Sequence, residues 1–280
     1  MKKSFIYLLI ILSGYQVLAG GGWVFEKNSG YFKVAQNMIR SQLFFDKGGA
    51  IVDIPTISLY TSSLYLEYGL TDKLDVIAYV PFFVRSTMNR QQIGQSGDVN
   101  PGDAINSFGD TDIALKYGFF QDRKIVMSAQ LLFGLPFGFS EVTAERILQT
   151  GDGEFNQMIR IDASHSFYPA PFYTSVYGAF NNRTRGFSEE VRVGGEVGWT
   201  PGNWILILKI EDRMSLYNGV ANDLEASGTF ANNTEYFSYT PEVSYLFNDN
   251  FGLTANAGLA LSGKRILAAP NFGFGLFWNL

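Results

Sequence analysis

The chain has 280 residues, 46% of them hydrophobic and 16% aromatic, and its formal net charge at pH 7 is −5. An acidic chain without runs of lysine or arginine is not expected to bind nucleic acid. Because the chain contains no cysteine, disulfides, cysteine-ligated zinc and a thiol nucleophile are excluded.

Residues 1–19 have the organisation of a secretory signal peptide. A basic start at Lys2 and Lys3 is followed by an apolar run over 5–12, and the segment ends at Ala19. This apolar run is too short to span a bilayer, which takes about 20 residues. We therefore expect cleavage after Ala19.

The remainder, residues 20–280, is expected to form one domain. Its first residues, Gly20–Gly22, are predicted to be a flexible stretch. No later apolar run reaches the length of a spanning helix. A membrane-embedded form of this chain must therefore be a closed β-barrel, in which every backbone group is paired internally.

Segments that alternate between apolar and polar residues follow along the whole chain. In 189–200, Val191 and Val193 lie on one face of a predicted strand, whereas Glu190 and Arg192 lie on the other. Twelve strands are predicted in this way, at 31–45, 56–69, 74–86, 108–119, 125–137, 155–167, 172–182, 189–200, 204–217, 234–247, 251–262 and 270–280.

Short and long connections alternate between these strands. The short ones are 70–73, 121–124, 168–171, 201–203 and 248–250. The long ones are 46–55, 87–107, 138–154, 183–188, 218–233 and 263–269. This alternation is typical of an all-β, up-and-down antiparallel transmembrane barrel with periplasmic turns and longer outer loops. Counts of ten or fourteen strands remain open, and a soluble barrel or sandwich is the rival architecture.

Aromatic residues concentrate beside the short turns, as expected for a girdle at the membrane–water interface. In the last segment, Phe272, Phe274 and Leu276 share one face with Trp278 and Leu280. This pattern looks like the C-terminal signal read by the outer-membrane assembly machinery. We therefore expect a location in the outer membrane of a Gram-negative bacterium, with membrane lipid and that machinery as partners.

The polar face of the predicted barrel carries few charges, of both signs, which suits a lumen better than a solvent-facing surface. These charges select a solute or form an ion-pair network that fills a narrow barrel; the sequence leaves both interpretations open. Asp110, Asp112 and Lys116 are the best candidates for one functional cluster. Besides Lys33 and Glu190, the polar face holds the lumen-lining candidates Glu67, Asp75, Asp110, Asp112, Lys116, Arg160, Asp162, Arg192, Glu196, Lys209, Glu211, Arg213 and Glu242.

The only histidine, His165, raises the alternative of a lipase-like outer-membrane enzyme. The strand pattern places His165 on the outward face, near the short turn at 168–171, and no serine motif accompanies it. A catalytic triad needs its three groups within hydrogen-bond reach. We therefore expect no enzyme activity, no catalytic residue, no metal and no cofactor.

Two motifs carry a resemblance to a known family. They are Tyr68-Gly69-Leu70-Thr71-Asp72-Lys73-Leu74 and, after a long polar loop, Phe108-Gly109-Asp110-Thr111-Asp112-Ile113-Ala114-Leu115-Lys116-Tyr117. Here the sequence resembles the outer-membrane transporter proteins of the MetA-pathway of phenol degradation family.

This resemblance implies a porin-like barrel that passes small solutes, including hydrophobic or aromatic molecules. It supplies no catalytic residues to transfer. The remaining alternative is a structural or adhesion barrel that acts through its extracellular loops.

Overall fold

The computed structural model of the protein describes residues 21–93, 98–143, 147–220 and 229–280. The expected signal peptide, residues 1–19, lies outside these ranges. Among the described residues, no helix has the length and apolar character needed to cross a membrane.

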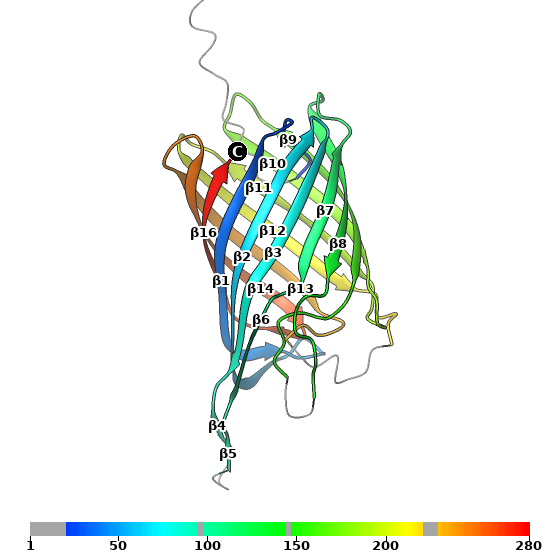
Figure 1. The fold of residues 1–280 in the computed structure, drawn as a ribbon, viewed down its shortest axis with the longest axis vertical. Coiled ribbons are helices and arrows are strands. Elements are labelled where there is room, and N and C mark those ends of the chain that lie inside the picture. The colour runs from blue at the N-terminus through cyan, green and yellow to red at the C-terminus, as the bar shows by residue number, and fades with distance from the viewer. Residues whose placement is uncertain (1–20, 94–97, 144–146, 221–228) are drawn as a thin grey trace, which may run out of the picture.

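Twelve antiparallel strands form a closed barrel, as predicted (Figure 1). Each wall strand pairs with its neighbours along the chain, and the circle closes because the first strand pairs with both the second and the last. The wall strands are β1 (Gly30–Phe45), β2 (Ile51–Thr71), β3 (Leu74–Met88), β7 (Thr111–Gly118), β8 (Ile125–Leu135), β9 (Asn156–Ser166), β10 (Phe172–Asn182), β11 (Glu190–Trp199), β12 (Trp204–Ser215), β13 (Glu235–Leu246), β14 (Phe251–Lys264) and β16 (Asn271–Asn279).

The connection between β1 and β2 is shorter than predicted. Ile51 already pairs with Phe45, and the turn is held by Asp46, whose carboxylate accepts hydrogen bonds from the N–H groups of Gly48 and Ala50. The predicted connection 46–55 was therefore wrong at its end. Polar and proline residues interrupt the alternation there, next to a shift in the strand register, where proline is tolerated.

Short strands lie within two predicted connections. The connection at 87–107 contains β4 (Gln91–Ile93), β5 (Asp98–Asn100) and β6 (Asp103–Ser107). The β4–β5 pair extends beyond the wall at the long-loop end (Figure 1). The connection at 263–269 contains β15 (Ile266–Leu267), which pairs with β1.

The two faces of the wall differ in chemistry. On β7, Ile113, Leu115 and Tyr117 are exposed on the outside, whereas the alternating Ala114 and Lys116 are buried inside. The same alternation on the other strands covers the outside with apolar side chains, as a lipid-facing surface requires.

Aromatic rings pack against one another around the short-turn end of the barrel. Phe172 stacks on Trp199 with ring centroids 5.8 Å apart, and Phe251 contacts Trp278 at 5.2 Å. The start of β1 and the C-terminus lie at this same end (Figure 1). Aromatic side chains therefore gather at the short-turn end, where the girdle is predicted.

Candidate functional site

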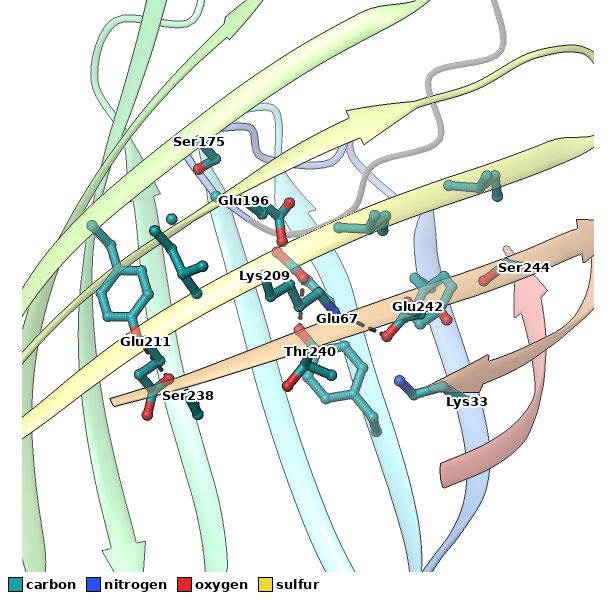
Figure 2. A pocket seen from close by; sticks show the side chains of 18 of the residues that line it. Lys33, Glu67, Ser175, Glu196, Lys209, Glu211, Ser238, Thr240, Glu242 and Ser244 are labelled. Carbon is teal, nitrogen blue, oxygen red and sulfur yellow. Dashed lines mark hydrogen bonds and ion pairs between the residues drawn. The ribbon is translucent and has the colours of Figure 1, made fainter. Parts of the chain in front are cut away.

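The interior of the barrel contains a chamber of about 480 Å³, which we call the central chamber. Figure 2 shows Lys33, Lys209 and Glu242 directed into this space from three different strands. Of the residues predicted to line a lumen, the chamber is lined by Glu67, Arg160, Glu196, Lys209, Glu211 and Glu242.

A second cavity of about 250 Å³ shares part of its wall with the central chamber. Glu67 and Arg160 line both cavities, and Asp112, Lys116 and Asp162 line only the second. The two cavities therefore belong to one charged interior.

Ion pairs within and between strands account for much of this charge. Lys116 Nζ lies 2.6 Å from Glu67 Oε1, and Lys209 Nζ lies 3.0 Å from Glu242 Oε2. Arg160 binds Asp162, two residues away on the same face of β9, at 2.7 Å. These pairs fix long side chains against the wall and leave the chamber open between them.

Tyrosine hydroxyls bind one carboxylate of the chamber. Glu211 accepts hydrogen bonds from Tyr177 at 2.6 Å and from Tyr236 at 2.5 Å. The guanidinium of Arg160 lies 3.7 Å from the ring centroid of Tyr177, in cation–π geometry. The wall therefore combines aromatic rings with charges.

Some chamber charges lack an oppositely charged partner within ion-pair distance among the described residues. They are Glu196, Glu211 and Lys33. One carboxylate oxygen of Glu196 is also buried, and it has no hydrogen-bond partner among the residues that the structure describes. Three bases and four acids line the chamber, so its formal net charge is −1.

A second charge network lies at the long-loop end. Arg183 contacts Asp152 at 3.0 Å, Glu154 at 2.5 Å and Glu190 at 2.8 Å. Burial raises the pKa of Glu154 to about 8, although the charge of Arg183 opposes this shift. Sequence reasoning missed Arg183 and Glu154 because both lie in connections, where no alternation assigns a face.

Two predicted lumen residues join this network from the wall. Arg192 lies 2.9 Å from Glu190, and Arg213 forms an ion pair with the same carboxylate. One glutamate thus joins three arginines, from the connection after β10 and from β11 and β12.

Asp110 does not line the chamber. It precedes β7, and its carboxylate accepts hydrogen bonds from the N–H groups of Gly138 at 2.9 Å and Asp152 at 2.6 Å. Burial, followed by the nearby carboxylate of Asp152, raises the pKa of Asp110 to about 6. The predicted cluster of Asp110, Asp112 and Lys116 therefore loses Asp110, which holds a loop, whereas Asp112 and Lys116 line the second cavity together.

The loop held by Asp110 connects β8 and β9 and enters the mouth of the barrel. Its Leu148 is fully buried against Ile57 of β2 and Leu267 of β15. Since β2 lies on a different part of the wall from β8 and β9, the loop reaches across the long-loop mouth. Leu148 therefore anchors this loop in an apolar cluster at the long-loop mouth.

Residues 21–29 line the wall at the short-turn end, so the predicted flexible stretch is wrong for Gly21 and Gly22. The N–H of Gly22 donates to Ser164 Oγ at 2.8 Å, and the N–H of Phe25 donates to Asp75 at 3.0 Å. A Cβ at Gly22 would lie 2.6 Å from the carbonyl oxygen of Val126. Only glycine permits this close approach.

The structure places His165 on the outer face of β9. A carbonyl oxygen can only accept, so Nδ1 of His165 donates its proton to the carbonyl oxygen of Lys124, 2.6 Å away. The imidazole also packs edge-on against Phe167 with ring centroids 4.7 Å apart. The described residues contain no group of three or more His, Cys, Asp or Glu that could hold a metal.

A closed barrel with an apolar outside and a charged, partly hollow inside has the fold of outer-membrane β-barrels. Solved structures of this class are similar to the chain. The COG4313 outer membrane channel from Pseudomonas putida F1 matches with a TM-score of 0.65 and 11% identity, over 95% of this chain and 100% of that one.

Two further structures share the fold. The NanC porin matches with a TM-score of 0.55 and 8% identity, over 89% of this chain and 100% of that one. The β domain of the Bordetella autotransporter BrkA matches with a TM-score of 0.51 and 10% identity, over 91% and 100%. No protein-family model and no curated protein matches the chain. The similarity thus establishes the fold, and the family resemblance seen in the sequence stays a prediction.

Proposed function

We propose that the protein is an outer-membrane channel through which small molecules pass. The observation that carries this proposal is the central chamber, about 480 Å³ of space inside a closed barrel. A barrel near eight strands is filled by its own side chains, whereas sixteen strands leave an aqueous channel. Twelve strands leave a space of intermediate size. Export by the expected signal peptide of residues 1–19 is part of the same proposal.

The chamber wall favours small solutes that carry an aromatic or hydrophobic group beside a polar one. The rings of Tyr31, Tyr65 and Phe277 pack together at this wall, with centroids of Tyr31 and Phe277 5.4 Å apart. Charged side chains lie on the same wall. An aromatic solute with a polar group can contact the rings and keep its polar group solvated or paired. The family resemblance points to the same class.

The test is conductance of the purified protein in planar bilayers, together with swelling of liposomes in small aromatic solutes and sugars. Wild-type protein should give discrete current steps, and aromatic solutes should enter faster than sugars of similar size. Ser238→Trp places a large ring into the chamber and should lower both signals. Phe237→Trp, on the outward face of the same strand, is the matched control and should leave them unchanged.

Absence of current steps and of swelling for every solute would reject the channel. Equal entry of aromatic solutes and sugars would retain the channel and reject the proposed solute class. Equal effects of the two tryptophan variants would show that solutes do not use the central chamber.

A further inference from the structure

A groove at the rim of the short-turn end shares no lining residue with the central chamber. It has a volume of about 600 Å³ and is lined by residues of the β7–β8 turn, the end of β9 and the segment before β1. These parts are adjacent because Ile125 at the start of β8 pairs with His165 near the end of β9. We call it the rim groove.

The rim groove is basic, although the whole chain is acidic. Arg123 and Lys124 line it and are exposed. Within the described residues, the only ion pair of Arg123 is a 3.9 Å contact with the exposed Asp122, a geometry that contributes little. Arg123 and Lys124, together with the neighbouring Asp122, carry a formal net charge of +1. Both basic side chains can therefore accept an anionic partner.

His165 adds a third polar group to the rim groove. Its Nδ1 is committed to the carbonyl oxygen of Lys124, so Nε2 is the nitrogen left for another partner. The hydrogen bond to Lys124 also orients the imidazole beside both basic residues. The groove thus gathers three nitrogen-bearing side chains at one place.

Apolar side chains border the same groove on the outer surface. Phe167 is 50% exposed, Tyr168 is 70% exposed and Ile125 is 56% exposed. These residues belong to the outward face and to the aromatic girdle at the short-turn end. A groove that is basic at its centre and apolar at its membrane edge matches a phospholipid, whose phosphate is joined to acyl chains.

We propose that the rim groove binds the headgroup of an anionic phospholipid, such as phosphatidylglycerol, in the leaflet at the short-turn end. Arg123, Lys124 and His165 contact the phosphate, and the acyl chains run along Ile125 and Phe167. Charge complementarity and the apolar border favour a lipid over free phosphate. The site is independent of the channel, since no group of the central chamber contributes to it.

The test is native mass spectrometry of the purified full chain, released from vesicles of phosphatidylglycerol and phosphatidylcholine. Wild-type protein should retain phosphatidylglycerol in preference. Each basic residue near an anionic headgroup contributes about 1 kcal/mol, or about five-fold in affinity, so Arg123→Ala with Lys124→Ala should weaken retention roughly 25-fold. Lys27→Ala with Lys73→Ala removes the same charge from exposed residues at the same end and should change little.

Other outcomes overturn the proposal. Equal losses in the two double variants would indicate a general effect of charge, and equal retention of both lipids would reject an anionic site. Release of the lipid by excess inorganic phosphate would indicate a free-anion site instead. Arg123→Gln with Lys124→Gln provides a second variant, and the salt dependence of wild-type retention tests the site without any substitution.

Discussion

Lys116 and Glu67 form an ion pair 2.6 Å long inside the barrel, with each side chain less than 5% exposed. Lys116 lies on β7 and Glu67 on β2, with β3 between them in the wall. The hydroxyl of Tyr65 also donates to Glu67 at 2.9 Å. The contact thus joins two strands that share no backbone hydrogen bonds.

Breaking this pair from one side should destabilise the barrel. Glu67→Gln leaves the ammonium of Lys116 buried without its partner, which costs about 3 kcal/mol. We expect that loss in urea unfolding of the protein folded in lipid vesicles. Glu67→Gln with Lys116→Met should recover part of the loss, and purely additive losses would contradict the coupling. Glu26→Gln, at an exposed carboxylate, is the control.

The wall of the barrel could be predicted from the sequence because its pattern is local. Lipid outside and polar groups inside impose a period of two on each strand, and residues such as Leu115 and Lys116 reveal it directly. The strand count followed from the turns between these segments.

The positions of inward-folded segments could not be predicted in this way. Leu148 and Arg183 lie in connections without periodicity, and their partners are distant in sequence. The sequence predicts a flexible stretch at Gly22 because nothing near it in sequence indicates the contact with Ser164. The sequence predicts that Asp110 lies in a strand because it continues the alternation of β7. In the structure its carboxylate accepts a hydrogen bond from the backbone of a loop.

Leu148→Ala should loosen the loop that crosses the long-loop mouth. Truncating a fully buried leucine side chain costs about 3 kcal/mol of stability. Because Leu148 packs on Ile57 and Leu267, this cost weakens the attachment of the loop to the wall. We expect larger or more frequent open-state currents in planar bilayers. Phe137→Ala, at a 60% exposed residue at the start of the same loop, should leave the currents unchanged. Identical currents for Leu148→Ala and wild type would argue that the loop does not limit passage.

The same loop should open as pH rises. Burial raises the pKa of Asp110 from 3.8 to about 6 and that of Glu154 from 4.5 to about 8, and neither residue lies in a wall strand. Both acids therefore bind protons more tightly in the packed loop than in a released one. Packing is most favourable below about pH 4, weakens as pH rises through about 4 to 8, and stays weakest above that range.

Single-channel recordings at pH 5 and pH 8 measure this effect, with a higher open fraction expected at pH 8. The groups facing the two acids are Asp152, Glu190 and Arg183. Asp110→Asn should remove the part of the pH dependence centred near pH 6. A wild-type open fraction that falls as pH rises would contradict the expected direction.

Charge in the central chamber should set its ion preference. With a formal net charge of −1, the chamber should favour cations over chloride. Glu211→Gln should weaken that preference, and Lys33→Gln should strengthen it. Reversal potentials in a potassium chloride gradient measure both shifts. Shifts of the same sign in the two variants would exclude simple electrostatic selection by these residues.

The pairing of Tyr31–Ile39 with Asn271–Asn279 also bears on how the protein is made. Because β1 pairs with β16 as well as with β2, the chain must be synthesised to its last strand before β1 can form both pairings. A product truncated ahead of β16 would leave β1 and β14 with unpaired edges, which are prone to aggregation. Such a truncated product should therefore aggregate more readily than the full chain.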